Sequence, residues 1–404
     1  MREAFLRREV IVVVGLVLAL FARSTSRATD APAVTIGFIN PATGPFAALG
    51  KYARKGLDLA LAEAKTDPAL RNVAFRVVQR DSEAKAAQAI RYARELTGRE
   101  NVDVLMGGLS SAECLSLEKF AGEEKIIYVP ASGCWVDEFS SQENVNRYSF
   151  RSTLDNRQRN YSFAQWLTGH LGRRWYVVYS DYAYGQSGLK AFTEAVEAAG
   201  GGVVGSIGIP FGATDVAAYI SKVDASAEAL YFVLAGRDAI LALQEALAQG
   251  LQKKMKFAGM QSLVSAENFP RLPQAAEGLV FIGDYPRDAN GPLETPANRE
   301  FRAAYFAKYP GDVIGLNAFE AYQSANALLE GIKRSGFRGR RDTEKLAAVL
   351  AGLRVPAGRE FPAGPLTIRR RDHQGVAPLY VAQVRAGREI VLDLIPAAGI
   401  GGIR

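Results

Sequence analysis

The sequence predicts an α/β protein made of two similar Rossmann-like lobes, each built on a parallel sheet. Short runs of β-branched residues alternate with helical periods along most of the chain. This alternation is typical of parallel strands whose connecting helices cover both faces of a sheet. It occurs in two series, one before residue 150 and one after it. The chain of 404 residues is also longer than the roughly 250–300 residues that one hydrophobic core supports.

The first series opens with a strand over 34–39 and a helix over 47–65, in which Leu49, Ala53 and Leu57 share one face. The strands expected next lie at 75–78, 102–106 and 126–129, and the helices between them at 84–97 and 112–122.

The second series repeats the pattern, with helices at 157–171, 189–199, 216–223 and 238–249 and strands at 175–179, 203–209, 230–234, 256–259 and 279–282. Three helices are expected at 298–309, 317–333 and 343–353. The tail favours antiparallel strands at 365–368, 379–385 and 390–394, with Ala386-Gly387 as a tight turn.

The N-terminus has the composition of a secretory signal peptide over residues 1–28. Arg2, Arg7 and Arg8 precede an uncharged apolar run, and Ser26-Arg27-Ala28 offers small residues for cleavage. The apolar run, 10–22, is shorter than the roughly 20 residues of a spanning helix. We therefore expect export to the periplasm, with a retained N-terminal anchor as the competing interpretation.

Composition argues against nucleic-acid binding and against catalysis. The net charge of +7 is spread along the chain, and the basic triplet 369–371 is read as a solvated strand edge. The two histidines, His170 and His373, belong to no nucleophilic or metal-binding motif, and no phosphate-binding loop is present. We expect no enzyme activity, no cofactor and no metal. Cys114 and Cys134 could form a disulfide or remain buried free thiols, and the sequence leaves both open.

Candidate ligand contacts lie in the loops after the strands, because ligands of open α/β sheets bind at the carboxyl ends of the strands. Ser110 and Ser111 follow the strand over 102–106 and open a helix, so we expect one to cap the helix and the other to face a ligand. The other candidates follow further strands or flank the first turn: Leu49, Ala131, Ser132, Gly133, Tyr184 and Gly236. An ordinary turn is the alternative for 131–133.

These residues together resemble the leucine/isoleucine/valine-binding family of type I periplasmic binding proteins. The resemblance covers nearly the whole chain after the signal peptide. It rests on the order and spacing of individually weak markers: Ile36-Gly37-Phe38, Thr43-Gly44-Pro45, Gly107-Gly108-Leu109-Ser110-Ser111, Phe150-Arg151, Asp181 with Tyr184-Gly185, Ala276-Glu277-Gly278 and Glu320-Ala321-Tyr322.

The resemblance implies two lobes joined by three crossover hinge segments: 33–150 with 284–360, and 151–283 with 361–396. It implies a monomer that closes on a small molecule and delivers it to the membrane permease of an ABC importer. Ser111 would bind the ligand carboxylate with help from the backbone of 131–133, and Tyr184 would close from the second lobe. Leu49 would form a side wall. A sensor of the same fold, presenting its ligand to a receptor or regulator, is the alternative function.

Two positions depart from the pattern of amino-acid binders. Gly133 stands where such proteins often carry threonine. Gln261 stands where an acidic residue would pair with the ligand ammonium. An alkylammonium taken from water needs a compensating charge. The resemblance implies a branched-chain amino acid or a related carboxylate or amide. Gln261 argues against an ordinary α-amino acid unless Asp238 or Asp284 supplies the missing charge, and it makes a short amide, a urea-like solute or an aromatic carboxylate a candidate.

Overall fold

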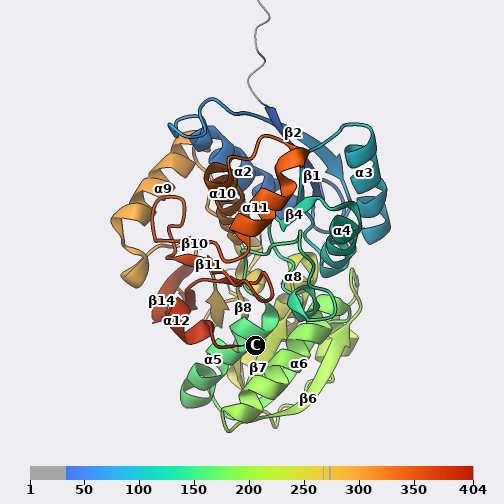
Figure 1. Ribbon diagram of the computed structural model, residues 1–404. Coiled ribbons are helices and arrows are strands. Elements are labelled where there is room, and N and C mark those ends of the chain that lie inside the picture. The colour runs from blue at the N-terminus through green and yellow to red at the C-terminus, as the bar shows by residue number, and fades with distance from the viewer. Residues whose placement is uncertain (1–32, 267, 273, 404) are drawn as a thin grey trace, which may run out of the picture.

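The computed structural model describes residues 33–403 except Glu267 and Pro273. The predicted signal peptide lies outside the described residues. The chain forms two lobes, the upper and lower halves of Figure 1, each arranged around its own sheet. Across 33–403, no helix combines the length and apolar character required to cross a bilayer.

Lobe I, defined here as the part built on the first sheet, has four parallel strands in the order β2-β1-β3-β4. The strands are β1 (Ala33–Asn40), β2 (Ala74–Asp81), β3 (Val104–Gly107) and β4 (Ile127–Pro130). The helices that connect them are α2 (Ala47–Ala64), α3 (Ala86–Gly98) and α4 (Ser111–Glu124). This is the predicted strand-helix repetition, with boundaries shifted by a few residues.

Lobe II, the part built on the second sheet, has the strand order β14-β13-β9-β8-β7-β5-β6. Its parallel strands are β5 (Arg174–Ser180), β6 (Gly202–Ile209), β7 (Ala229–Val233), β8 (Lys256–Met260) and β9 (Val280–Gly283). Its helices are α5 (Asn156–His170), α6 (Ala183–Ala198), α7 (Ala217–Ile220) and α8 (Gly236–Ala248). Helix α7 is a single turn where the sequence predicted a longer helix.

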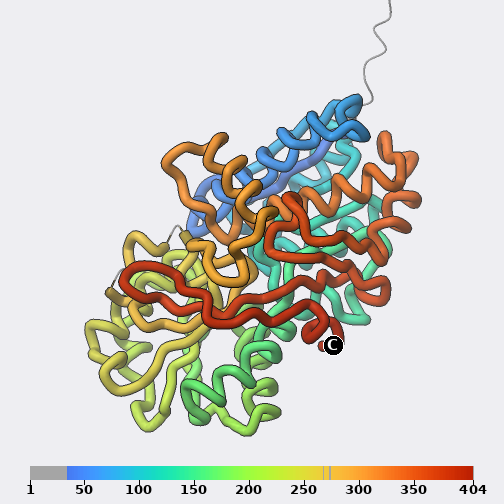
Figure 2. The backbone as a smooth tube through the Cα atoms, turned by 90° about the vertical axis from the view of Figure 1, so that its left-hand side faces the viewer, coloured from blue at the N-terminus to red at the C-terminus, as the bar shows by residue number. Residues whose placement is uncertain are grey.

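The C-terminal third returns first to lobe I and then to lobe II. Helices α9 (Pro296–Lys308), α10 (Leu316–Ser335) and α11 (Thr343–Leu350) come first, and α10 packs along α2. A small antiparallel sheet follows, formed by β10 (Arg354–Val355), β11 (Leu366–Ile368) and β12 (Gly375–Val376). The hairpin of β13 (Leu379–Arg385) and β14 (Arg388–Ile395) then adds to β9, and α12 (Ala397–Ile400) ends the fold. Figure 2 shows this red hairpin running along the yellow strands of lobe II.

The chain passes between the two sheets three times, through 131–155, 284–295 and 351–378. The first and third passages lie side by side, because Arg151 forms a bridge with Gln374. The exact division into lobes given above stays a prediction.

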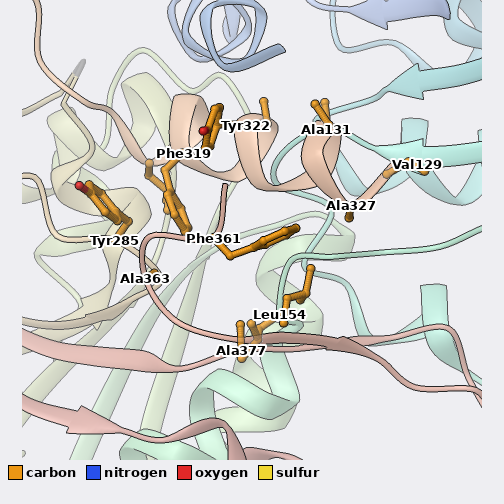
Figure 3. Close-up of a cluster of buried hydrophobic side chains, with 14 of the residues drawn as sticks. Val129, Ala131, Leu154, Tyr285, Phe319, Tyr322, Ala327, Phe361, Ala363 and Ala377 are labelled. Carbon is orange, nitrogen blue, oxygen red and sulfur yellow. The ribbon is translucent and has the colours of Figure 1, made fainter. Parts of the chain in front are cut away.

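A hydrophobic cluster lies where these passages meet α10 (Figure 3). Leu154 comes from the first passage, Tyr285 from the second and Phe361 from the third. The ring of Tyr285 stacks on Phe319 of α10, with centroids 4.6 Å apart. The hinge region is therefore packed like a core, and its three segments are expected to move together.

Candidate functional site

A cavity lies between the two lobes, at the carboxyl ends of the strands of both sheets. Its volume is about 40 Å³, counted as the space open to the centres of water molecules. The wall from lobe I and its first passage is formed by Phe46, Leu49, Leu109, Ser111, Gly133, Cys134, Trp135, Leu316 and Asn317. The wall from lobe II is formed by Tyr182, Tyr184, Ala235, Ser262 and Ser265. The wall is thus aromatic and apolar, with a few hydroxyl and amide groups.

The two serines that open α4 have different roles. Ser110 is the N-cap: its Oγ accepts from the Glu113 N–H and donates to Glu113 Oε2 at 2.8 Å. Ser111 lines the cavity, and within the described residues its Oγ and its N–H have no hydrogen-bond partner. The first two N–H groups of a helix lack partners inside the helix, and Ala112 carries the second. Ser111 and Ala112 together therefore offer free donors to a ligand.

The loop after β4 contributes less than predicted. Ala131 is fully buried in the hydrophobic core, and Ser132 is turned away from the cavity. Ser132 Oγ donates to Glu320 Oε2 at 3.1 Å and accepts from Asn317 Nδ2 at 2.6 Å. The Gly133 N–H, expected to help bind the carboxylate, donates instead to Glu320 Oε2 at 2.8 Å. Only Gly133 of the three predicted residues lines the cavity.

Gly133 has a backbone reason to be glycine. Its φ is +63°, in the left-handed region, and a Cβ there would lie 2.6 Å from the carbonyl oxygen of Leu109. A threonine would be strained at this position. The departure from the amino-acid binders is therefore built into the path of the loop.

Tyr184 reaches the cavity from the first turn of α6, not from a loop. The sequence placed the start of this helix at 189, but α6 begins at Ala183. Tyr184 Oη and Ser262 Oγ are 3.0 Å apart, and Ser262 also donates to the Leu234 carbonyl. Tyr184 must therefore donate to Ser262. Burial raises the pKa of Tyr184 to about 12, so the phenol stays neutral.

Gln261, predicted to contact the ligand, does not line the cavity. Its side chain is buried and lies against the end of β9, where Nε2 donates to the Tyr285 carbonyl and Oε1 accepts from the Tyr285 N–H. Strand β8 ends at Met260, and Gln261 begins a short 3₁₀ turn. This turn directs the Gln261 amide toward the end of β9. Ser262 and Ser265 line the cavity at this point instead.

Gly236 does not line the cavity either, although Ala235 before it does. Gly236 lies beside the ring of Phe46. Leu49 is part of the wall, as predicted. Cys114 and Cys134 are buried free thiols, so no disulfide joins them in the structure.

Several wall residues were missed by the sequence reading, among them Ser262, Ser265, Trp135 and Asn317. Ser262 and Ser265 follow β8 and obey the same strand-end rule that found the serines of α4. Trp135 lies two residues beyond Gly133, and Asn317 sits in the first turn of α10. No local pattern marks Asn317, because its position depends on how α10 packs against the other lobe I elements.

A buried ionic cluster supports the cavity wall from behind. Arg159 of α5 donates to Asp284 Oδ2 at 2.8 Å and to Glu320 Oε1 at 3.3 Å, and all three side chains are almost fully buried. The Arg159 guanidinium lies over the Trp135 ring, 3.9 Å from its centroid. The Trp135 indole N–H donates to Glu320 Oε1 at 2.9 Å. The cluster therefore fixes the aromatic wall at Trp135.

The ionic cluster holds one guanidinium against two carboxylates. Burial and the neighbouring Asp284 raise the pKa of Glu320 to about 8, although Arg159 acts in the opposite direction. The Glu320 carboxyl is therefore protonated at neutral pH. With Glu320 protonated, the cluster of Arg159, Asp284 and Glu320 that supports the wall carries no net charge.

Neither of the acidic residues considered as partners for a ligand ammonium is available. Asp238 accepts from the Gly212 N–H at 2.9 Å, and Asp284 is engaged by Arg159. No ionisable Asp, Glu, Lys, Arg or His belongs to the cavity wall in the described part of the chain. The wall offers hydrogen-bond donors for a carboxylate and no counter-charge for an ammonium group.

Two α/β lobes that enclose a small cavity between their strand ends define a hinged, ligand-binding class of protein. The comparisons with known proteins agree. Residues 33–389 match the model of the periplasmic binding protein family. The chain belongs to this family, as the type I fold and the leucine/isoleucine/valine-binding resemblance predicted.

Individual relatives are distant but cover most of the chain. The Leu/Ile/Val-binding protein homolog 6 of Brucella suis biovar 1 is 24% identical over 376 residues, 91% of each chain. Leu/Ile/Val-binding protein homolog 8 of the same organism is 23% identical over 356 residues, 86% of this chain and 87% of the relative.

Solved structures show the same fold. A solute-binding protein of an ABC transporter from Rhodopseudomonas palustris BisB5, in complex with 3,4-dihydroxybenzoic acid, aligns with a TM-score of 0.80 at 23% identity, covering 91% of this chain and 98% of that one. A benzoate complex from R. palustris gives 0.80 at 22% identity, covering 90% and 97%. A leucine-binding protein from Thermotoga maritima gives 0.76 at 20% identity, covering 90% and 99%.

Proposed function

We propose that the protein is the exported solute-binding component of an ABC importer and that it captures a small aromatic carboxylate by closing its two lobes. The observation that carries the ligand class is the composition of the cavity wall. Aromatic rings and hydroxyl groups surround the space, and the described wall has no carboxylate for an ammonium group. The two R. palustris structures hold 3,4-dihydroxybenzoic acid and benzoate, which are small aromatic carboxylates, and their likeness to this chain supports the proposal.

The carboxylate would meet the donors at the start of α4. Ser111 Oγ and the N–H groups of Ser111 and Ala112 are the free donors there, and the positive end of a helix dipole favours an anion. The ring of the ligand would lie among Phe46, Trp135 and Tyr184. Aromatic pairs of this kind add about 0.5–1.5 kcal/mol beyond the area they bury.

A free amino acid fits this cavity poorly. Its carboxylate could use the same donors, but its ammonium group would lose water without gaining a counter-charge. An unpaired buried charge costs several kcal/mol. Leucine should therefore bind much more weakly than an aromatic acid of similar size.

A ligand panel tests the proposal directly. The mature protein is titrated calorimetrically with benzoate, 4-hydroxybenzoate, 3,4-dihydroxybenzoate, benzamide and leucine, and its thermal unfolding is followed with each. A ligand at 100 times its Kd adds about 2.7 kcal/mol to the stability, which raises the melting temperature by several degrees. We expect the benzoates to give the largest shifts and leucine none. A larger shift with leucine would show that the proposed ligand class is wrong.

A further inference from the structure

Phe46 joins the two lobes at the edge of the cavity. It precedes α2 in lobe I and is buried, packed against Leu49 and Leu109 of its own lobe and against Tyr182 of lobe II. Its ring meets Phe211 with centroids 5.2 Å apart at 65°, and Phe211 meets Tyr182 at 5.1 Å and 58°. Both partners lie in lobe II, in the loops after β6 and β5. The three rings therefore form a row across the boundary between the lobes.

The loop that carries Phe211 is held in place by α8. The Gly212 N–H donates to Asp238 Oδ2 at 2.9 Å, and Arg237 Nη2 donates to the Gly212 carbonyl at 3.0 Å. Phe211 itself is 42% exposed, so it does not serve the core of lobe II. An anchored loop that presents a half-exposed aromatic ring to the other lobe has the form of a docking contact.

Gly236 completes the contact from the other side. Its φ is +59°, and a Cβ at this position would lie 3.2 Å from the Phe46 ring. The missing side chain leaves room for that ring. Tyr182, Phe211 and Gly236 of lobe II thus form a slot that receives Phe46 of lobe I.

We propose that Phe46 and this slot, which we call the aromatic clasp, hold the lobes closed and set the rate at which a ligand leaves the cavity. The contact between Phe46 and Phe211 joins the two lobes, and separation of the lobes would break it. An interaction made in only one of two states shifts the equilibrium toward that state. The clasp therefore acts on opening, and Phe211 acts without being part of the cavity wall.

Release kinetics of 4-hydroxybenzoate test the clasp, and this arm rests on the proposed ligand class. Trp135 lies in the cavity wall, so its fluorescence can follow release in a stopped-flow experiment. Loss of one aromatic pair in Phe211→Ala should speed release about 2- to 10-fold, with little change in the association rate. Phe211→Tyr should keep the wild-type rate. Val204→Ala is the matched control, because Val204 is equally exposed and lies on β6 of the same lobe.

Equal release rates for wild type and Phe211→Ala would overturn the clasp. If the wild-type protein binds none of the benzoates, the proposed ligand class is wrong. Small-angle X-ray scattering of the ligand-free proteins then tests the aromatic clasp independently of the ligand. A larger radius of gyration for Phe211→Ala than for wild type and Val204→Ala supports the clasp. Equal radii reject it. Thermal unfolding of each variant confirms that the exposed ring was removed without loss of the fold.

Discussion

At the residue scale, adjacent serines have a structural role and a proposed binding role. Ser110 caps α4 and forms a reciprocal pair with Glu113, whereas Ser111 faces the cavity with free hydrogen-bonding capacity. The residue pattern left open which serine takes which role, and the family resemblance assigned the ligand to Ser111. The direction of the chain at the end of β3 decides it.

Substitution of the two serines should therefore give opposite results. Ser111→Ala removes a hydrogen bond to a charged ligand and should weaken 4-hydroxybenzoate binding about 10-fold or more, with an unchanged melting temperature. Ser110→Ala removes a helix cap and should lower the free energy of unfolding by about 1 kcal/mol. Calorimetry and urea denaturation measure the two effects. Undiminished binding by Ser111→Ala would place the carboxylate elsewhere.

Glu118 offers a second test at the residue scale. Its carboxyl is buried on α4, and neither oxygen has a hydrogen-bond partner in the described structure. Burial, together with the neighbouring Cys134, raises its pKa from 4.5 to about 9. The folded protein therefore holds a proton there that the unfolded chain loses at lower pH, so stability should fall as the pH rises between about 4.5 and 9.

Glu118→Gln should remove this dependence. The amide mimics the protonated carboxyl, so the variant should match wild type near pH 5 and become progressively more stable than it toward pH 8.5. The gain should approach about 1.4 kcal/mol for each pH unit in that window. Urea unfolding across the pH range measures it, with the exposed Glu123→Gln of the same helix as control. Parallel pH profiles for Glu118→Gln and wild type would contradict the assignment.

At the scale of single elements, the loop 131–135 shows how backbone conformation limits ligand chemistry. The loop turns through a positive φ at Gly133 and gives its N–H to Glu320 of α10. It therefore cannot carry the threonine common in amino-acid binders without moving away from Leu109. The donors for a ligand shift to the start of α4.

A threonine placed at this position should damage the loop without creating an amino-acid site. Gly133→Thr combines a strained φ with a Cβ 2.6 Å from the Leu109 carbonyl oxygen. We expect a loss of about 1–3 kcal/mol or more in the free energy of unfolding, and weaker 4-hydroxybenzoate binding. Gly200→Thr is the control, because φ is +81° there but the space is open. Gly200→Thr should be destabilised less than Gly133→Thr and should bind 4-hydroxybenzoate normally. Leucine binding by Gly133→Thr would refute this account.

At the scale of the whole molecule, the ionic cluster of Arg159, Asp284 and Glu320 connects both lobes with the second passage between them. Its members come from α5, the end of β9 and α10, and they meet behind Trp135 of the cavity wall. The charge behind the cavity is thus set by groups that lie far apart in the sequence.

This arrangement predicts a pH dependence of ligand affinity. Above a pH of about 8, Glu320 loses its proton, and the support of the wall gains a negative charge. The affinity for benzoate, which keeps a constant charge over this range, should then fall about tenfold by pH 9.5, because like charges repel at short range. The affinity for neutral benzamide should stay constant, and Glu320→Gln should abolish the dependence. Calorimetry between pH 6.5 and 9.5 measures both, and a constant benzoate affinity in the wild type would contradict the prediction.

The sequence alone determined the class of fold, the two series of strands and helices, and the edges of the sheets where the cavity lies. These features follow from local periodicity and from the rule that ligands bind at strand ends, and both are readable along the chain. Ser111, Gly133, Tyr184 and Leu49 were found in this way.

Only the tertiary structure decided which side chains face the cavity and what charge lies behind it. Gln261 turns toward β9, Ser132 toward α10 and Gly236 toward Phe46, because each is directed by an element distant in the sequence. The same is true of Asn317 and of the ionic cluster. Local periodicity fixes where a strand ends, but long-range packing fixes the direction in which the next side chain points.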